Sequence, residues 1–269
     1  GKVVVVAAHA IETPRLLLNS AQEGAENGIA NSSDQVGRNL MDHPTKLSWA
    51  LAPEPVWPYR GPLSTSGIEN IRDGEFRKDR AAFRIEIGND GHSWPTGAPV
   101  STAAELVNSG LRGEELDAAI KDATSRHIRL ASLVEQSPNA ENRVTLDPEK
   151  KDANGMPLPR IYFDFDDYTR AGLDAAQEAH DEIFAALGAT GVNHSPDIQG
   201  AGHVIGTVRM GDDAVTAVVD ADMRSFDHSN LFLLGSGTFP TSATANPSLT
   251  IAALSLRAVD VIAATAARG

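Results

Sequence analysis

Apolar stretches alternate with polar stretches along the chain, and their lengths and spacing predict strands and helices. Lys2 to Ala8 is a continuous apolar run rich in β-branched residues, which is typical of a short buried strand covered on both faces. Residues at helical spacing follow, with Thr13 as the expected N-cap and Pro14 in the first turn. Because the chain begins directly in this strand, we expect it to be a fragment or one piece of a two-chain protein.

The middle of the chain, from about residue 45 to residue 199, differs in texture from both ends. Short apolar segments predict strands at Lys46–Leu51, Ala81–Ile87, Ile128–Glu135, Arg143–Leu146 and Arg160–Phe165. Helical spacing predicts helices over Leu111–Thr124 and Asp167–Leu187. Loops rich in Pro and Gly are expected over Pro53–Pro62 and Gly88–Pro99. These elements predict an α+β layer set apart from the first strand and helix.

The last part of the chain is rich in glycine. We expect a loop over Gly200–Gly211, a short buried strand over Leu231–Leu234 and an irregular segment over Gly235–Asn246. Pro247 then lies in the first turn of a final helix. The apolar residues of this helix predict a largely buried surface.

Composition limits the classes of function. The chain has 269 residues, of which 41% are hydrophobic and 22% charged, as in ordinary globular proteins. Its formal net charge is −13 and it has no run of five or more basic residues, so we expect no nucleic-acid partner. The absence of cysteine excludes disulfides, zinc–thiolate sites and a cysteine nucleophile. There is no uninterrupted run of about 18 apolar residues and no signal peptide, so we expect a soluble protein, cytoplasmic or periplasmic.

Two glycine-rich segments near the C-terminus carry the candidate chemistry. Gly202–Gly211 contains His203, which has no acidic or metal-ligating neighbour in sequence, and a lone loop histidine is often structural. Gly235–Thr241 follows the predicted buried strand and continues through Asn246 and Pro247 into the final helix. Backbone N–H groups and the helix dipole favour an anionic or electron-rich group at such a place. An ordinary strand–loop–helix connection is the alternative.

Further blocks of sequence stand in a fixed order around these two segments. Toward the C-terminus the order is His-x-x-Gly-Thr-x-Arg-Met-Gly, Val-Val-Asp, Asn-Leu, Gly-Ser-Gly-x-x-Pro-Thr and Asn-Pro-x-x-Thr, followed by an apolar helix. The other blocks are Ala7–Leu17, Val36–Pro44, Asn142–Val144 and Pro159–Arg160. This order resembles the glucose-methanol-choline (GMC) oxidoreductases over nearly the whole chain. It is most similar to bacterial sugar and polyol dehydrogenases and to pyranose oxidase-like members.

The resemblance implies roles for particular residues. His203 falls on the family's catalytic histidine, which accepts the substrate hydroxyl proton while the carbinol hydride passes to N5 of FAD. Asn246 falls where the family has a second His or an Asn, and would orient the substrate oxygen. His43 is implied to lie near the flavin or to be structural. The residues implied to contact FAD are Ala8, Gly235, Ser236, Thr238, Asn246, Pro247 and Thr250.

The resemblance also implies an α/β fold with two domains. Residues 1–44 and 200–269 would form the C-terminal portion of a Rossmann-like FAD-binding domain, and residues 45–199 an inserted substrate domain of a sheet and packed helices. The family's dinucleotide fingerprint Gly-x-Gly-x-x-Gly is absent from this sequence. The implied partners are therefore a complementary N-terminal half or chain that carries it, a sugar or polyol substrate, and an electron-acceptor subunit.

Alternatives to this interpretation stay open. The same scaffold supports oxidases and hydroxynitrile lyases, and the chain could instead be a fragment that does not catalyse. Hydrolase chemistry is not supported, because no Gly-x-Ser-x-Gly occurs. The acidic pairs lack the loop of a calcium site, so we expect no metal. The remaining histidines lack zinc-like spacing and are expected to be structural or exposed: His92, His127, His180, His194 and His228.

Overall fold

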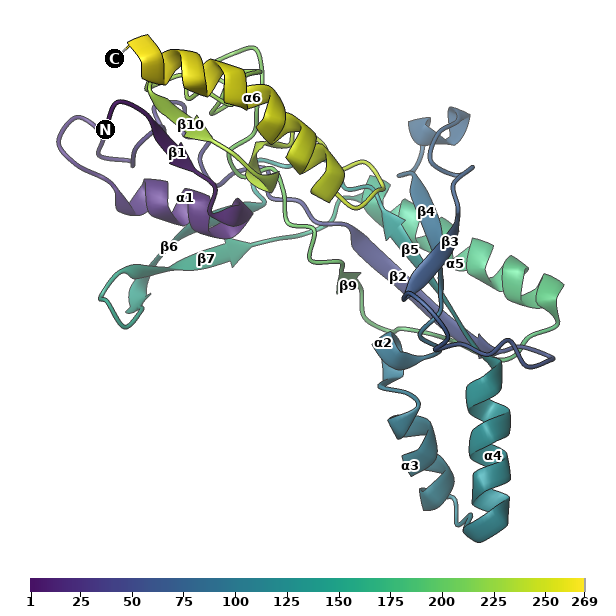
Figure 1. Ribbon diagram of the computed structural model, residues 1–269. Helices are drawn as coiled ribbons and strands as arrows, with labels where there is room; N and C mark the ends of the chain where they lie inside the picture. Colours follow the sequence, from purple (N-terminus) through teal and green to yellow (C-terminus); the bar gives the residue numbers. More distant parts are fainter. Residues whose placement is uncertain (269) are drawn as a thin grey trace. The chain divides into compact units, whose positions relative to one another are not determined.

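The computed structural model describes residues 1–268, which form two compact units (Figure 1). The first unit contains Gly1–His43, Gln136–Asp166 and the residues from Gly202 onward; the second contains Pro44–Glu135 and Asp167–Ala201. The chain crosses between the units after His43, Glu135, Asp166 and Ala201. The structure divides the middle differently, however, because Gln136–Asp166 packs with the terminal segments.

The first unit contains a pair of parallel strands, β1 (Val4–Val6) and β10 (Leu231–Leu233), which are in register with Val4 opposite Leu231. Helix α1 (His9–Asn19) follows β1 directly. The expected N-cap is wrong, because the helix begins at His9 and Thr13 lies inside its first turns. Thr13 still serves the helix start, since its hydroxyl accepts a hydrogen bond from the Ala8 backbone N–H at 3.2 Å.

Pro14 lies inside α1, where it has no N–H to donate to the carbonyl of Ala10 one turn earlier. The hydroxyl of Thr207 donates to that carbonyl at 2.6 Å. Ala10, Pro14 and Thr207 are all buried, so water does not replace the missing bond. A residue from the glycine-rich segment thus completes the hydrogen bonding of the first helix.

Strands β6 (Arg143–Lys151) and β7 (Pro157–Tyr162) form an antiparallel hairpin in the same unit. The second strand ends earlier than the expected Arg160–Phe165. The side chain of Asn142 replaces the ladder there: its amide group donates to the Asp164 carbonyl and accepts from the Asp164 N–H, both at 2.8 Å. This pair of bonds turns the chain out of the strand.

The expected burial of the two terminal apolar elements is wrong. Val4 and Val5 of β1 are 41% and 45% exposed, because β10 is the strand that pairs with β1 in the described chain. The final helix α6 (Ser248–Arg268) packs through Ile251 and Leu254. Ala258 is also buried, but Leu249, Leu256 and Val259 are 83%, 72% and 50% exposed.

Helix α6 is also long and apolar enough to cross a membrane by length and composition, with a mean hydropathy of 1.6 over Ser248–Ala267. The expectation of no such segment rested on uninterrupted apolar runs, which Arg257 and Asp260 break. Charged side chains near the middle of a spanning helix are costly, and core helices of globular proteins share the same composition. Length and composition alone therefore do not assign this helix to a membrane.

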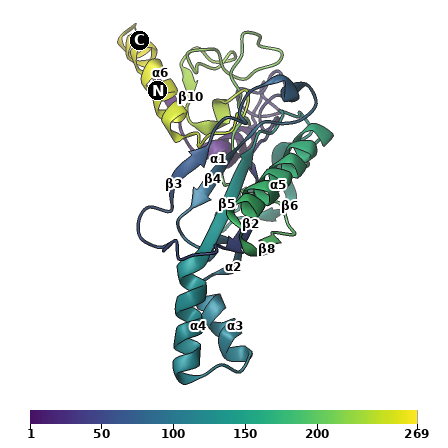
Figure 2. The same ribbon diagram turned by 90° about the vertical axis from the view of Figure 1, so that its right-hand side faces the viewer.

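The second unit is built on an antiparallel sheet in the order β3-β4-β5-β2-β8, with β9 pairing beside β2. Its strands are β2 (Pro44–Leu51), β3 (Ser64–Ile68), β4 (Phe83–Gly88), β5 (His127–Val134), β8 (Thr190–His194) and β9 (Gln199–Gly200). Helix α5 (Asp167–Leu187) lies across one face of this sheet (Figure 2). Phe83, Leu173 and Phe184 are in the core between them. The predicted strands at positions 46, 81 and 128 and the predicted helix over 167–187 are confirmed.

Three helices stand at the loop ends of this sheet: α2 (Ser93–Thr96), α3 (Val100–Asn108) and α4 (Gly113–Arg126). Helix α4 confirms the prediction over 111–124, and packs against α3 as a hairpin (Figure 1). The expected loop over Gly88–Pro99 is wrong in its second half, where α2 forms a single turn. The 3₁₀ helices Glu75–Lys78 and Ser236–Thr238 complete the elements.

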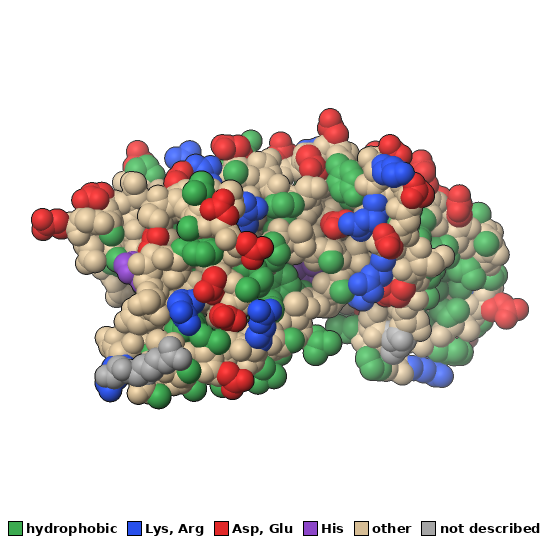
Figure 3. Space-filling view, turned by 90° about the horizontal axis from the view of Figure 1, so that it is seen from above, with side chains coloured by type: hydrophobic (Ala, Val, Ile, Leu, Met, Phe, Trp, Pro, Cys, Tyr) green, Lys and Arg blue, Asp and Glu red, His purple; other side chains and the backbone are tan. Residues whose placement is uncertain are grey.

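Acidic and basic side chains are interspersed over the face of the molecule seen in Figure 3. The structure also contains ion pairs between residues four apart in sequence, such as Lys121–Asp117 and Arg38–Asp34. Exposed pairs of this kind contribute little to stability.

Candidate functional site

The two glycine-rich segments lie side by side within the first unit. The backbone N–H groups of Gly206, Val208 and Met210 donate to the carbonyls of Ser236, Gly237 and Thr238, at 3.2, 2.8 and 2.8 Å respectively. These bonds hold the segment that carries His203 against the segment that follows β10. The structure therefore brings together two motifs that are more than twenty residues apart in sequence.

Gly206 makes room for a third segment, Asn39–His43. Its φ is +98°, and a Cβ atom placed on it would lie 2.1 Å from the carbonyl oxygen of Asn39. The next residues pair in both directions, with Met41 N donating to Ile205 O at 3.0 Å and Ile205 N donating to Met41 O at 2.9 Å. A side chain at position 206 would push the two segments apart.

His43 and His203 contact each other at the end of these paired segments. Their Nδ1 atoms are 3.0 Å apart, and their rings are nearly perpendicular, with centroids 5.0 Å apart. His43 is fully buried, whereas His203 is partly exposed. The second ring nitrogen of His43, Nε2, lies 3.0 Å from the carbonyl oxygen of Ser242. The Nδ1 side of the His203 ring therefore faces the buried His43.

Asp42 ties the two histidines together through the backbone. Its Oδ1 accepts hydrogen bonds from the N–H groups of His43 and His203, both at 2.7 Å, and its Oδ2 accepts from the N–H of Gly202 at 3.1 Å. Asp42 thus fixes the backbone on both sides of the histidine pair.

Gln136 and Ser242 hold the other end of this arrangement. The side-chain oxygen of Gln136 accepts from Asp42 N at 2.9 Å, and Gln136 N donates to Ser242 Oγ at 2.8 Å. The Ser242 hydroxyl donates back to the Gln136 carbonyl at 3.1 Å. Gln136 and Ser242 are 2% and 5% exposed, so these bonds form away from water and set the orientation of the segment whose carbonyl faces His43.

Burial lowers the pKa of His43 below its ordinary value, and the adjacent His203 ring lowers it further. Backbone hydrogen bonds with Ser242 and Ala243 and the charge of Asp42 act in the opposite direction but more weakly. His43 is therefore neutral near neutral pH. A neutral imidazole has one donor and one acceptor nitrogen, so Nδ1 and Nε2 of His43 take opposite roles.

The carboxyl ends of β1 and β10 form the place where the FAD implied by the resemblance would lie. The two strands are parallel, so Ala8 and Gly235, just beyond their ends, lie at the same edge, where doubly wound α/β folds bind ligands. Ala8 is exposed, and no described heavy atom lies within 4 Å of a Cβ built on Gly235. These two positions fit a group that approaches the backbone closely.

The other residues expected to contact the cofactor differ in their accessibility. Thr238 is fully buried and donates its hydroxyl to the Gly235 carbonyl at 2.9 Å, so its side chain supports the turn. Ser236 and Pro247 are also buried. Asn246 and Thr250 are exposed at the start of α6. The contacts expected from Ser236, Thr238 and Pro247 therefore fall to their backbone or to the structure they support.

Thr244, two residues before Asn246, adds an unsatisfied polar group near this helix start. It is 2% exposed, and its hydroxyl oxygen has no hydrogen-bond partner among the described residues. A buried hydroxyl without a partner is costly. The start of α6 together with this hydroxyl fits a polar ligand group.

Residues that the sequence did not single out make up much of the site. Asp42 belongs to a recognised block but was given no role, and Gln136 and Ser242 belong to none of the quoted motifs. His43 was left between two interpretations, and the structure places it against His203. The nearest signal in the sequence was the adjacency of Asp42 and His43 in a block that precedes a predicted strand.

The other histidines of the second unit form buried structural contacts. His92 stacks on His127 with ring centroids 3.8 Å apart. His180 contacts the hydroxyls of Ser48 and Ser132 at 2.7 and 2.8 Å. Ser48 also contacts His194, which pairs with Asp181, but Ser48 is fully buried on a strand and cannot act as a nucleophile. In residues 1–268, no group of three or more His, Cys, Asp and Glu could hold a metal ion.

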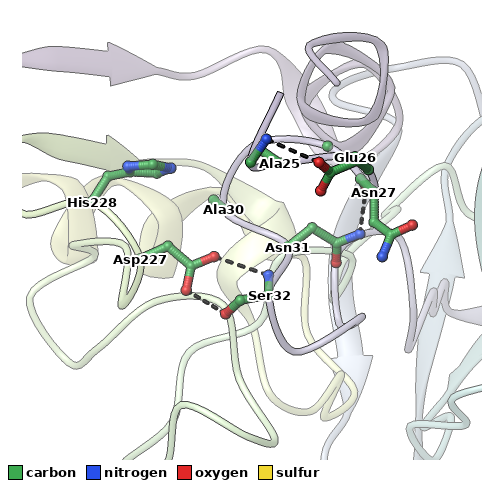
Figure 4. A pocket seen from close by; sticks show the side chains of 10 residues that line it. Ala25, Glu26, Asn27, Ala30, Asn31, Ser32, Asp227 and His228 are labelled. Carbon is green, nitrogen blue, oxygen red and sulfur yellow. Dashed lines mark hydrogen bonds between the residues drawn. The ribbon is translucent and has the colours of Figure 1, made fainter. Parts of the chain in front are cut away.

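A separate pocket of about 390 Å³ lies in the first unit (Figure 4). The segment 24–32 and the residues Asp227 and His228 line it. Asp227 accepts from the N–H and hydroxyl of Ser32, and Glu26 accepts from Gly24 N (Figure 4). Because His228 precedes β10 while Gly235 follows it, this pocket lies at the opposite end of the strand from the histidine pair. Its carboxylates are engaged within the loops.

Two sequence models described as GMC oxidoreductase match the chain, over residues 1–45 and 138–255. The large subunit of fructose dehydrogenase from Gluconobacter japonicus is 39% identical over 97% of this chain and 47% of its own length. The 2-methyl-1,2-propanediol dehydrogenase from Mycolicibacterium austroafricanum is 29% identical over 97% of this chain and 48% of its own length.

Among solved structures, formate oxidase has a similar fold, with a TM-score of 0.67 and 16% identity over 97% of this chain and 54% of that chain. The chain therefore spans about half the length of the relatives it matches. The expected α/β fold is confirmed by this likeness and by the mixed strands and helices of both units. The order of the sequence blocks, the matching models and these relatives agree, and the chain belongs to the GMC oxidoreductase family.

Proposed function

We propose that this chain carries the proton-accepting side of the active site of an FAD-dependent oxidoreductase, which oxidises an alcohol group on a sugar or polyol. The observation that supports this most strongly is the His43–His203 pair, held by Asp42 beside the segment that follows β10. His203 is partly exposed while its partner is buried, so it is the member of the pair that a substrate can reach.

The chain's own residues would bind and orient the alcohol and take up its proton. His203 would accept the hydroxyl proton, because a neutral imidazole has a suitable pKa for a base near neutral pH. Asn246 would hydrogen-bond the substrate oxygen and orient it, but an amide cannot accept the proton. FAD, when bound, would supply the acceptor for the hydride of the carbinol carbon. The backbone at Ala8 and Gly235 and the start of α6 at Asn246 and Thr250 would hold it.

The partner we propose is the complementary N-terminal part of the flavoprotein, which carries the dinucleotide fingerprint. The exposed apolar residues of β1 and α6, such as Val5 and Leu249, support this proposal, because contiguous exposed apolar surface is often a protein–protein contact site. The fructose dehydrogenase relative is named as a large subunit. This name supports a further proposal, that electrons leave the flavin through an acceptor subunit.

The test compares His203→Ala with the unchanged holoenzyme in anaerobic rapid mixing, with fructose and a panel of polyols as substrates. We expect the rate of flavin reduction to fall by about 10²–10⁴-fold, the usual contribution of a positioned base. The visible absorption of bound FAD should stay the same. His228→Ala is the matched control, because His228 lies at the other end of β10.

Unchanged flavin reduction in His203→Ala would overturn the proposal, and so would the absence of FAD from the purified protein that contains both halves. The electron acceptor is read from the same preparation. Peroxide formation under air identifies an oxidase, whereas turnover with dyes or quinones alone identifies a dehydrogenase.

A further inference from the structure

The contacts of His43 determine where its proton lies. The Ser242 carbonyl oxygen can only accept a hydrogen bond, so His43 Nε2, 3.0 Å away, must carry a hydrogen. His43 is fully buried, and a buried imidazolium is unfavourable unless a negative group pairs with its ring. Burial and the adjacent His203 ring both lower the pKa of His43 below its ordinary value. His43 is therefore neutral, and its Nδ1 carries a lone pair.

The acceptor role of Nδ1 of His43 determines the role of Nδ1 of His203. The Nδ1 atoms are 3.0 Å apart, which is hydrogen-bond distance, so one of them must donate. Since Nδ1 of His43 is an acceptor, Nδ1 of His203 is the donor and carries a hydrogen. When His203 is neutral, its lone pair is then on Nε2.

We propose that His43 is a positioning residue that holds His203 as its Nδ1–H tautomer, so that His203 gains and loses its proton at Nε2. The tautomer follows from the hydrogen-bond chain alone; its use in alcohol oxidation rests on the function proposed above. The Nδ1–H donor is present in both neutral and protonated His203, so the contact with His43 persists through a cycle of proton uptake and release. The base therefore needs no rotation of its ring.

The series of hydrogen bonds from Ser242 through His43 to His203 is held in place at Ser242. Gln136 exchanges two hydrogen bonds with Ser242, at 2.8 and 3.1 Å, and accepts from Asp42 N. The Gln136 backbone thus holds Ser242, the Gln136 side chain holds the backbone of Asp42, and the Asp42 carboxylate holds the backbone of both histidines. The charged and titratable groups that act on His43 are His203 and Asp42.

The direct test is ¹⁵N NMR of the holoenzyme labelled at histidine, with the His203 signals identified by their loss in His203→Gln. We expect a protonated Nδ1 and an unprotonated Nε2 in neutral His203. A protonated Nε2 with a bare Nδ1 would overturn the inference. This readout does not depend on turnover, so the tautomer can fail while His203 remains the base, and the base can fail while the tautomer stands.

The kinetic test compares two substitutions of similar size, His43→Asn and His43→Leu. Both lose the bond to Ser242, but only Asn keeps an acceptor near the position of Nδ1. We expect flavin reduction in the Leu variant to be roughly 10- to 100-fold slower than in the Asn variant, a part of what a positioned base contributes. The apparent pKa assigned to His203, read from the pH dependence of the flavin-reduction rate, should also be lower in the Leu variant. Leu has no acceptor to stabilise the protonated His203 ring.

Equal rates and equal apparent pKa values of His203 in the two variants would overturn the positioning role, since a purely structural contribution of His43 would affect both alike. If the Leu variant does not fold, the NMR measurement on the unchanged holoenzyme still decides the tautomer. A higher apparent pKa of His203 in the Asn variant than in the Leu variant is the result that only the proposed role explains.

Discussion

The hydroxyl of Thr207 should stabilise α1 because it replaces a hydrogen bond that Pro14 cannot make. Thr207 donates to the Ala10 carbonyl at 2.6 Å, and both residues are fully buried. Replacing Thr207 with Val keeps the shape of the side chain but removes the donor. The Ala10 carbonyl is then left without a partner in the interior, because Pro14 has no N–H.

The size of this effect follows from the cost of an unsatisfied buried carbonyl. Leaving such a group unpaired costs about 1–3 kcal/mol. Since about 1.4 kcal/mol corresponds to a factor of ten, the opening equilibrium of α1 should increase by roughly 5- to 150-fold in Thr207→Val. Thr207→Ser keeps the hydroxyl and should stay close to the unchanged protein.

A second substitution makes the reasoning specific. Pro14→Ala restores an N–H that can donate to the Ala10 carbonyl one turn back. In that background Thr207→Val no longer leaves the carbonyl unpaired, so its effect should fall below about 1 kcal/mol. The difference between the two backgrounds, about 1–2 kcal/mol, is the coupling free energy of a double-mutant cycle.

The assay is hydrogen exchange of the holoenzyme, followed by mass spectrometry of peptides that cover His9–Asn19. It measures local opening and does not require the whole protein to unfold in one step. Exchange in the peptides of the second unit is the internal reference. Equal effects of Thr207→Val in the unchanged protein and in the Pro14→Ala background would refute the argument, because the hydroxyl would then not be replacing the missing N–H.

Two further predictions concern stability. Gly206→Ala should lower the melting temperature much more than Gly155→Ala does. Both glycines have positive φ, but only at Gly206 would the added Cβ lie 2.1 Å from a backbone atom, the Asn39 carbonyl oxygen. Thermal unfolding measures the two shifts, and equal shifts would contradict the prediction. Stability should also fall as pH falls from about 6.5 toward 4, because burial lowers the pKa of His127 from 6.5 to about 4 and the unfolded chain takes up the proton first. Urea unfolding at pH 7 and pH 4.5 checks this, and His127→Gln should reduce the difference; the same difference in both proteins would contradict the assignment.

Elements whose pattern reflects their own packing could be predicted from the sequence. Helix α5 has the predicted bounds, because Leu173, Ala176 and Phe184 recur at helical spacing and pack on the sheet. The strands of the second unit were found for the same reason. Helix α2, in contrast, lies in a segment whose Pro and Gly residues predict a loop, and a single turn carries too little periodicity to outweigh them.

Burial of the terminal elements could not be predicted, because it depends on what covers them. The apolar pattern of β1 and α6 correctly predicts a strand and a helix. It predicts a buried environment only if neighbours are present on both sides. In the described chain β1 pairs with β10, and α6 packs through the side that carries Ile251 and Leu254. The exposed fractions of Val5 and Leu249 therefore depend on which neighbours are present, whereas their apolar pattern predicts only a strand and a helix.

The site shows the same limit at the level of single atoms. The motif order singles out His203 as the candidate base, but the tautomer proposed for it depends on buried hydrogen bonds that run from the Ser242 carbonyl through His43. Each of these bonds has a direction, because a carbonyl accepts and a neutral imidazole donates from one nitrogen only. Gln136, which no motif contains, supplies the bonds that hold Ser242 in place. A candidate base can therefore be identified from sequence, while the hydrogen bonds that would set its tautomer come from residues such as Gln136 and Ser242 that no motif contains.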